Sequence, residues 1–401
     1  MPNYFAYSPE QAELLPRHVR DELPKQHLCF LVHEVVERQD LRSFDAAYGE
    51  EGQRAYDPRM MLKVWLYGFA VNVRSTRKLE RRIQEDLGFR YLAGGLRPDH
   101  KTLSEFLRRH GEALEELFTQ VLSWAREAGM ARLGRVAIDS TRIKANASAD
   151  RLARQDQQQV RRWRREMEQE DPDQDPGLEV EATTAERLRE RMSQTRSATG
   201  SEPRSQTVGM ARGEKRSLTD EDARFLRERG GRFKLGYSAE LAVSEDHFIV
   251  AARVTQQAAD TASLLPMLEQ VEQQCGEKPR QVLADSGFYS GANLDGLRER
   301  GIDGYVADTN LAAAMKAGGE VRQGNRCVRH SETLRMREKL RTPRGRRTYL
   351  HRKAMVEPVI GTLKEQRGMR QFLRRGLNAV HREWLLACIS YNLTRAYRLL
   401  R

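Results

Sequence analysis

Two short apolar runs, residues 136–138 and 282–284, each end directly in an aspartate. The first run, Val-Ala-Ile, precedes Asp139, and the second, Val-Leu-Ala, precedes Asp285. Uninterrupted apolar runs of this length are typical of strands buried inside a sheet. A carboxylate at the end of such a strand is poorly solvated and needs a partner. The pattern therefore predicts a sheet with two strand-end carboxylates, which a hard divalent cation would satisfy.

A third acid, Glu357, lies in the sequence MVEPVIG and is followed seven residues later by Lys364. Residues 353–364 have the pattern of a helix, so these two side chains would share one helix face. Two strand-borne aspartates and one helix-borne glutamate supply the oxygen ligands that Mg²⁺ or Mn²⁺ prefers. On a basic chain, such a site indicates phosphodiester chemistry on nucleic acid. For any one of the three acids alone, an ordinary strand-end or surface carboxylate is the simpler interpretation.

Basic residues outnumber acidic ones by 69 to 57, which gives the chain a formal net charge of +12. They gather in four stretches, at 74–82, 161–165, 322–353 and 367–375. The alternative to a polyanionic partner is a basic surface that only keeps the protein soluble. Because the basic residues cluster, we favour nucleic acid as the partner.

Several classes of protein are disfavoured by what the sequence lacks. The four cysteines lie far apart with no CxxC pair, which argues against a zinc knuckle or a disulfide framework and fits a reducing cytoplasm. We expect no signal peptide and no membrane span, because no suitable apolar run is present. The sequence has no GxxxxGK(S/T) loop, so we expect no nucleotide cofactor. Its histidines lack metal-ligand spacing, which disfavours a transition-metal site.

Residues 1–128 have a helical pattern throughout. We expect helices at 28–36, 59–72, 76–87 and 101–128, with Asp57-Pro58, Ser75 and Asp99 at the starts of the last three. The helix at 76–87 and the turn before it supply four DNA-binding candidates: Arg74, Arg77, Lys78 and Arg81. Helices joined by short turns, one of them strongly basic, suit a helix-turn-helix-like DNA reader. A plain helical bundle with a solvated charged face fits equally, and the sequence leaves both open.

The rest of the chain alternates strands and helices, which predicts a mixed α/β sheet. The expected order is a first strand within 134–143 that ends near Asp139, a hairpin at 233–243 and 248–254, a helix at 264–275, a strand at 281–285, a helix at 293–300, a strand at 303–307, and helices at 353–364 and 383–399. Two segments interrupt this order, a polar insertion at 147–232 and a basic, loop-rich segment at 308–350. The insertion could contact DNA, contact a second subunit, or do neither.

Three blocks of sequence resemble the catalytic blocks of bacterial insertion-sequence transposases of the DDE class. They are VAIDSTRIKANAS around Asp139, VLADSGFYS around Asp285, and RKAMVEPVIGTLKEQRGMRQFLRRG around Glu357. The segments DPRMMLKVWLYGFAVNVRSTRKLERR and LRPDHKTLSEFLRRH resemble the helical N-terminal domain of one branch of these enzymes. Asp260, at the start of the expected helix 264–275, also fits that branch. The resemblance covers most of the chain outside residues 147–220 and 308–340.

The resemblance implies an α/β catalytic core with a ribonuclease H-like fold, preceded by an all-α DNA-binding domain. In this sequence the two domains would be residues 1–128 and 129–401. The implied activity is that of a transposase, which binds the terminal inverted repeats of its element in double-stranded DNA, cleaves there, and joins the 3′-OH to target DNA. Asp139, Asp285 and Glu357 would hold two Mg²⁺ or Mn²⁺ ions per active site. Pairing two ends implies a homodimer in the DNA complex, and the setting would be the bacterial cytoplasm at the nucleoid.

Cations around the glutamate depart from the family pattern. Related enzymes often carry a Tyr, an Arg three residues later, and the catalytic Glu four residues after that Arg. Here Tyr349 and Arg352 keep the first spacing, but Glu357 stands five residues after Arg352, and Lys353 fills the position four before it. Both cations, together with Lys364, are therefore candidates for binding DNA phosphate, and either Arg352 or Lys353 would support Glu357.

Two rival functions stay open. One is a stand-alone metal-dependent nuclease with the same core, and the other is a DNA-binding protein that has lost its chemistry. The expected N-terminal helical domain disfavours a plain nuclease, and the presence of all three acids disfavours loss of chemistry.

Overall fold

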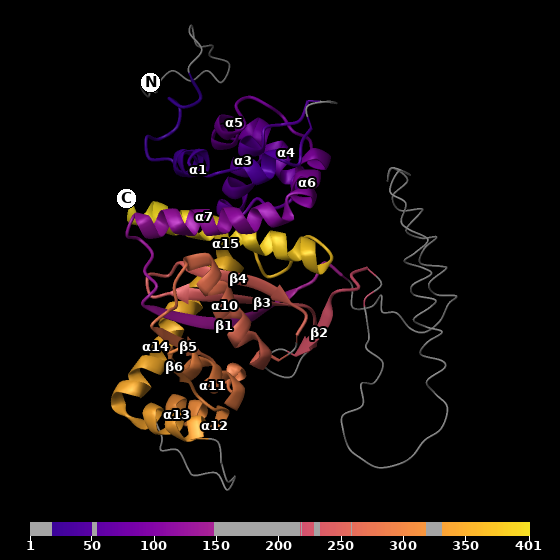
Figure 1. Cartoon of the computed structure of the whole chain (residues 1–401). Coiled ribbons are helices and arrows are strands. Elements are labelled where there is room, and N and C mark those ends of the chain that lie inside the picture. The colour runs from indigo at the N-terminus through magenta and orange to yellow at the C-terminus, as the bar shows by residue number, and fades with distance from the viewer. Residues whose placement is uncertain are drawn as a thin grey trace, which may run out of the picture. The chain divides into compact units, whose positions relative to one another are not determined.

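The computed structural model describes residues 18–49, 54–147, 217, 219–227, 233–257, 259–317 and 331–401 (Figure 1). Apart from Ser217, these residues belong to one compact unit, which joins the chain up to Ser148 with the chain from Thr219 onward. The expected insertion at 147–232 lies almost wholly outside the described residues. No helix in the described part is long and apolar enough to cross a lipid bilayer.

The N-terminal part of the chain is helical, as predicted. Its helices are α1 (Leu28–Glu37), α2 (Arg42–Asp45), α3 (Pro58–Ala70), α4 (Thr76–Glu85), α5 (Leu87–Leu92), α6 (His100–Arg109) and α7 (Gly111–Glu127). Two predicted caps are confirmed, because Asp57 accepts from Arg59 N (2.7 Å) and Asp99 accepts from Thr102 N (2.7 Å). Each carboxylate satisfies one backbone N–H that the first helical turn leaves without a partner. Ser75 precedes α4 as predicted but forms no side-chain cap.

The single helix predicted over 101–128 is wrong, because the chain breaks at His110 into α6 and α7. Arg382 stabilises this break. Its Nη1 donates to the carbonyls of Leu107 (3.3 Å) and Arg108 (2.6 Å) in the last turn of α6. These acceptors are satisfied by a side chain instead of by a continuing helix. At Gly111, a Cβ would collide with the same guanidinium. A partner more than 270 residues away therefore decides this boundary.

A mixed sheet forms the centre of the second half of the chain, which confirms the α/β prediction. Its strands are β1 (Arg135–Lys144), β2 (Arg224–Arg227), β3 (Phe233–Ser244), β4 (Ile249–Thr255), β5 (Gln281–Ala284) and β6 (Asp303–Val306). The order is β2-β3-β1-β5-β6, and β4 also pairs with β3. β3 runs antiparallel to β1, whereas β1, β5 and β6 run parallel. The parallel connections pass through α10 (Leu264–Cys275) and α11 (Gly291–Glu299).

Asp139 lies inside its strand, whereas the sequence predicted that the strand would end near it. The reason is that β1 has two different neighbours. Pairing with β5 stops at Ile138 opposite Ala284, but pairing with β3 continues to Lys144 opposite Gly236. The long antiparallel partner therefore keeps β1 extended beyond the point where its parallel partner ends.

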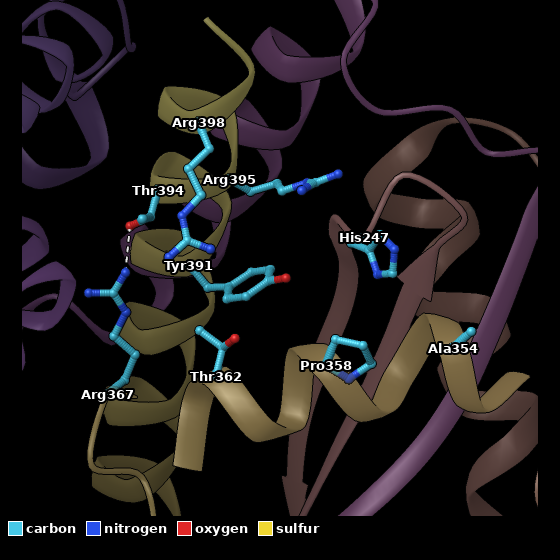
Figure 2. A pocket seen from close by; sticks show the side chains of 9 residues that line it. All are labelled: His247, Ala354, Pro358, Thr362, Arg367, Tyr391, Thr394, Arg395 and Arg398. Atoms are coloured by element: carbon cyan, nitrogen blue, oxygen red, sulfur yellow. Dashed lines mark hydrogen bonds between the residues drawn. The ribbon is translucent and has the colours of Figure 1, made fainter. Parts of the chain in front are cut away.

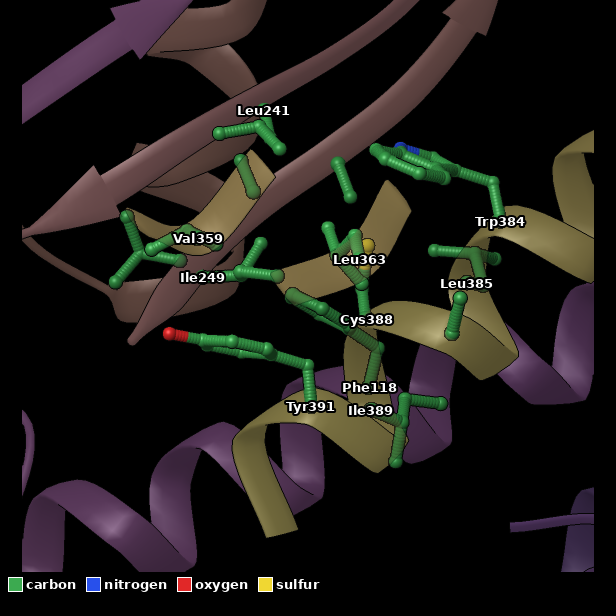
Figure 3. Close-up of a cluster of buried hydrophobic side chains, with 14 of the residues drawn as sticks. Phe118, Leu241, Ile249, Val359, Leu363, Trp384, Leu385, Cys388, Ile389 and Tyr391 are labelled. Carbon is green, nitrogen blue, oxygen red and sulfur yellow. The ribbon is translucent and has the colours of Figure 1, made fainter. Parts of the chain in front are cut away.

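α15 (Leu377–Leu399), the longest of the described helices, lies between the sheet and the N-terminal helices. It packs against β4 on one side and against α3 and α7 on the other. Figure 3 shows this core, in which Trp384 and Cys388 of α15 lie among Leu241 and Ile249 of the sheet and Phe118 of α7. A helix buried around most of its circumference is a central element of a fold. The C-terminus of the chain therefore joins the N-terminal helices and the sheet into one core.

The prediction that residues 308–350 are loop-rich is wrong for the part of this segment that the structure describes. That part contains α12 (Thr309–Ala317), α13 (Ser331–Arg341) and the start of α14 (Pro343–Gly361). Apolar residues are few in α13, and α12 is a short run of small apolar residues, so neither showed clear helical periodicity in the sequence. The helices are fixed by caps instead: Thr342 accepts from Gly345 N (3.0 Å), and Asp308 accepts from Leu311 N (3.0 Å).

Candidate active site

Asp139 and Asp285 meet because their strands are parallel neighbours. The last residue pair between β1 and β5 is Ile138 opposite Ala284, and the two aspartates are the next residue on each strand. Neighbouring strands lie about 4.8 Å apart. Two carboxylates that the sequence separates by more than a hundred residues therefore stand side by side at the end of β5.

Arg352 of α14 lies between these two carboxylates. Its Nη1 donates to Asp139 Oδ2 (2.7 Å), and its Nη2 donates to Asp285 Oδ1 (3.2 Å). The arginine is only 4% exposed. It belongs to the buried stripe of α14, together with Met355 and Val356, which packs that helix against β1 and β5. The guanidinium thus joins the two strand ends from a third element.

The two aspartates, Asp139 and Asp285, have one positive charge between them, that of Arg352. Burial raises the pKa of Asp139 above its ordinary value, Arg352 opposes that rise, and the neighbouring charge of Asp285 adds to it. Burial alone would lower the pKa of Arg352, but the two aspartates hold it above its ordinary value. One guanidinium faces two carboxylates, so an additional or stronger cation would be favoured there.

The donor atoms fit a hard divalent ion. Carboxylate oxygens from two rigid strands are the ligands that Mg²⁺ and Mn²⁺ take, with water and phosphate oxygens to complete the shell. Asp139 and Asp285 supply two such groups. Within the described part of the chain, however, no cluster of three His, Cys, Asp or Glu side chains is placed to hold a metal ion. The structure thus brings together two of the three acids expected from the sequence.

Glu357 is exposed and lies apart from the aspartate pair. It follows Arg352 by five residues, which turns it about 140° around the helix axis from the guanidinium. No hydrogen bond or ion pair with another described residue involves it. Lys353, one helical turn before it, is also exposed and forms no ion pair with it in the described part. Neither candidate cation therefore supports Glu357 here, and Arg352 is bound to the aspartates.

Lys364 is half-buried in the π-helical turn Thr362–Gln366, which follows α14. Its Nζ donates to the carbonyl of Arg142 on β1 (3.4 Å). A π turn holds one more residue than an α turn, so the expected alignment of Lys364 with Glu357 does not carry across it. The lysine instead lies along β1, three residues beyond Asp139.

The four N-terminal candidates for DNA binding fall into two groups. Arg77, Lys78 and Arg81 are exposed on α4 and face solvent. The side chain of Arg74 is buried, and its Nη1 donates to Glu383 of α15 (2.9 Å). Its Nη2 donates to the carbonyl of Gly368. The prediction that Arg74 contacts DNA finds no support in this arrangement, because its donors are used inside the protein.

Asp260 is a residue whose role the sequence did not reveal. It directly precedes η1 (Thr261–Ser263), and its Oδ1 accepts from Ser140 Oγ (2.8 Å) and Arg142 Nη2 (3.1 Å) on β1. On its other side, a Cβ added at Gly287 would lie 3.0 Å from its Oδ2. Asp260 therefore contacts the strand just after Asp139 and packs against the turn just after Asp285.

Three further hydrogen bonds fix this arrangement. Thr261 Oγ1 donates to the Gly287 carbonyl (3.1 Å), and the buried Asn293 donates from Nδ2 to the carbonyls of Thr261 (2.7 Å) and Phe288 (2.7 Å). The segment after β4 is thereby fastened to η2 (Ser286–Phe288), which follows Asp285. The only signal in the sequence was the position of Asp260 at the start of a predicted helix. No local pattern indicated its partners.

Comparison with known protein families gives two matches in chain order. Residues 17–109 match a model described as transposase domain (DUF772), and residues 131–393 match a model described as transposase DDE domain. The second match covers well over half of the chain and contains Asp139, Asp285 and Glu357. No match was found among curated proteins, and none among solved structures.

Proposed function

Since the chain belongs to the insertion-sequence transposases of the DDE family, we propose that it binds the terminal inverted repeats of its own element, cleaves a phosphodiester at each end, and joins the freed 3′-OH to target DNA. The observation that carries this proposal is the meeting of Asp139 and Asp285 at the end of β5. Phosphoryl transfer needs positioned charge more than covalent chemistry, and two carboxylates on rigid strands supply such a position.

The proposed fold of the core is ribonuclease H-like. Three features support it: β3 is antiparallel to β1, β5 and β6 follow in parallel on the other side of β1, and α14 packs against β1 and β5 with Arg352. Asp139 lies on β1, the middle strand of the order β2-β3-β1-β5-β6, and Asp285 directly follows the neighbouring parallel strand β5, which supports this fold. We also retain the proposed division into a DNA-binding part at 1–128 and a catalytic part at 129–401, although α15 packs on both.

We propose that Asp139 and Asp285 hold the divalent cation or cations, with Glu357 as the third acid. When bound, a divalent ion would polarise the scissile phosphate and lower the pKa of the attacking hydroxyl group. In the absence of a bound ion, Arg352 would neutralise the aspartates and hold them in register. Glu357 is outside the buried stripe of α14 and has no partner among the described residues. Its carboxylate is therefore available to join the metal site in the complex with DNA.

DNA contact is proposed for the exposed cations of α4 and for two residues of the catalytic part. Arg77, Lys78 and Arg81 would contact phosphates near the inverted repeat, while Lys353 and Lys364 would contact phosphates close to the cleaved bond. Pairing the two ends of an element requires two active sites, so a homodimer is expected in the complex with DNA.

The deciding experiment is a strand-transfer assay with Mg²⁺ or Mn²⁺ and duplexes that carry pre-cleaved element ends. Joining to a target plasmid is expected for the wild type, and Asp139→Asn should abolish cleavage and joining while leaving end binding intact. Cleavage without joining would show a nuclease instead. Unchanged cleavage by the Asn variant would remove Asp139 from the mechanism.

A further inference from the structure

A cavity of about 310 Å³ lies on a flank of α14 away from Arg352 (Figure 2). Ala354, Pro358 and Thr362, spaced four residues apart, form its wall on α14 and the turn that follows. The C-terminal half of α15 forms the opposite wall, and His247 in the turn between β3 and β4 closes one end. None of these residues belongs to the aspartate site or to the exposed face of α4.

Three arginines line this cavity: Arg367, Arg395 and Arg398. No carboxylate lines it among the described residues, and none of the three arginines forms an ion pair with a described acid. Arg395 donates from Nε to the carbonyl of Asp246 (3.1 Å), and Arg398 is exposed. The nearby Asp246 carboxylate interacts with Arg395 but is paired with Arg132 (2.8 Å). The cavity therefore keeps an excess of positive charge, which favours an anionic ligand.

Arg367 gives the strongest indication of an anion site. It is 7% exposed, and its Nη2 donates to Thr394 Oγ1 (2.9 Å), but its buried Nε has no hydrogen-bond partner. Burial, reinforced by the nearby charge of Arg398, lowers its pKa to about 10. A buried guanidinium with an unused donor is unfavourable unless a ligand supplies charge and an acceptor.

His247 and Tyr391 also line the cavity. The Nδ1 of His247 lies 3.1 Å from the Met355 carbonyl. A carbonyl only accepts, so this hydrogen bond requires the proton on Nδ1. Tyr391 is largely buried, and Figure 2 shows its ring extending from α15 across the cavity between Arg395 and Pro358. A phenol beside arginines offers an additional donor to an anion's oxygens.

We propose that this cavity binds a phosphate group through Arg367, Arg395 and Arg398. Guanidinium groups match the paired oxygens of phosphate with parallel N–H donors, which a chloride ion cannot exploit. The cavity is larger than one phosphate needs, so the group can be part of a larger molecule. Two sources share this chemistry, a free phosphate or pyrophosphate and a phosphate of the DNA backbone. The cavity contains no residue of the proposed catalytic site, and phosphate binding there does not depend on transposition.

The test is titration calorimetry on the full chain with inorganic phosphate and with pyrophosphate, at constant ionic strength against chloride. Arg398→Ala is the main variant, because Arg398 is exposed and forms no hydrogen bond or ion pair within the described part. Arg341→Ala, an exposed arginine at the end of α13, gives the same change of charge and is the matched control. Arg398→Lys separates charge from guanidinium geometry.

Saturable binding that Arg398→Ala weakens by roughly tenfold or more, and that Arg341→Ala leaves unchanged, supports a site for free phosphate. A second arm measures binding of a duplex without element ends. If only this arm responds, and more strongly to Arg398→Ala than to Arg341→Ala, the phosphate comes from the DNA backbone. Equal effects of the two alanine variants in both arms, or no effect of either, would overturn the proposal.

Discussion

Arg352 Nη1 lies 2.7 Å from Asp139 Oδ2, and the same guanidinium reaches Asp285 through its other terminal nitrogen. The Arg352 guanidinium thus occupies the position between the two carboxylates that a divalent ion would favour. The arrangement keeps two like charges together on adjacent strands before any ligand arrives. A metal ion bound there would compete with Arg352 for the same oxygens.

The first prediction concerns that competition. Arg352→Ala should destabilise the metal-free protein by up to about 3 kcal/mol, because removing one partner of a buried pair leaves charges uncompensated. Mg²⁺ or Mn²⁺ should then raise the melting temperature of the variant more than that of the wild type, since the ion replaces the lost charge. Thermal melts with and without metal measure both effects. Arg347→Ala, exposed on the same helix, is the control, and equal metal responses in all three proteins would contradict the competition.

The second prediction concerns pH. Burial raises the pKa of Asp139, so its ionised form destabilises the metal-free fold. Relative to Asp139→Asn, the wild type should be most stable below the ordinary aspartate pKa of about 4 and should lose stability as pH rises through the higher folded value. Melting temperatures of both proteins from acid to neutral pH, without divalent ions, give this difference directly. A wild type that gains stability over the variant as pH rises would show that Arg352 outweighs burial.

The third prediction assigns Asp260 a positioning role. Asp260→Ala should reduce cleavage by roughly 10- to 100-fold and raise the metal concentration needed for half-maximal activity, because the segments that carry both aspartates lose their shared anchor. Asp260→Asn, which can still accept from Ser140, should retain more activity. DNA binding and melting temperature should change little in either variant. If cleavage falls only in proportion to stability, Asp260 is structural and nothing more.

Elements of the fold could be predicted from the sequence where their signal is local, and were missed where they depend on distant residues. The boundaries of α10 were predicted to the residue, and the strands that carry Asp139 and Asp285 were found, because apolar periodicity and apolar runs are local properties. The break at His110 was missed, since it depends on Arg382 far along the chain. α13 was missed because its many charged residues hid its few buried positions, and α12 because it is a short run of small apolar residues without clear periodicity.

In the candidate active site, too, features with a local signal could be predicted and features that depend on distant residues could not. Asp139 and Asp285 could be placed together because parallel strands bring their carboxyl ends to the same side. The partners of Arg352 could not be predicted from the sequence. Arg352 and Lys353 are neighbours in the chain, and only the packing of α14 buries the arginine and leaves the lysine exposed. The burial of Arg74 likewise depended on Glu383, which the sequence places more than 300 residues away.

The fourth prediction separates Arg74 from the DNA-binding residues. Glu383 is 2% exposed and also accepts from the backbone N–H groups of Leu373 (2.9 Å) and Arg374 (3.0 Å). Glu383→Ala should therefore destabilise the protein by about 3–5 kcal/mol, as expected when one member of a buried pair is removed. Denaturant unfolding of Arg74→Met, Glu383→Gln and the double variant should show a loss smaller than the sum of the two single losses. Strict additivity would mean that the pair is not coupled.

The last prediction concerns the exposed face of α4. Replacing Arg77, Lys78 and Arg81 together by Ala should weaken binding to element ends and reduce the slope of log K against log salt by up to about 3, since each phosphate contact contributes about 0.9. The stability of the fold should not change, because these side chains face solvent. Arg74→Met tests the contrast: it should lower the melting temperature but leave the salt slope as in the wild type. A triple variant with an unchanged slope would place the inverted-repeat contacts on another surface.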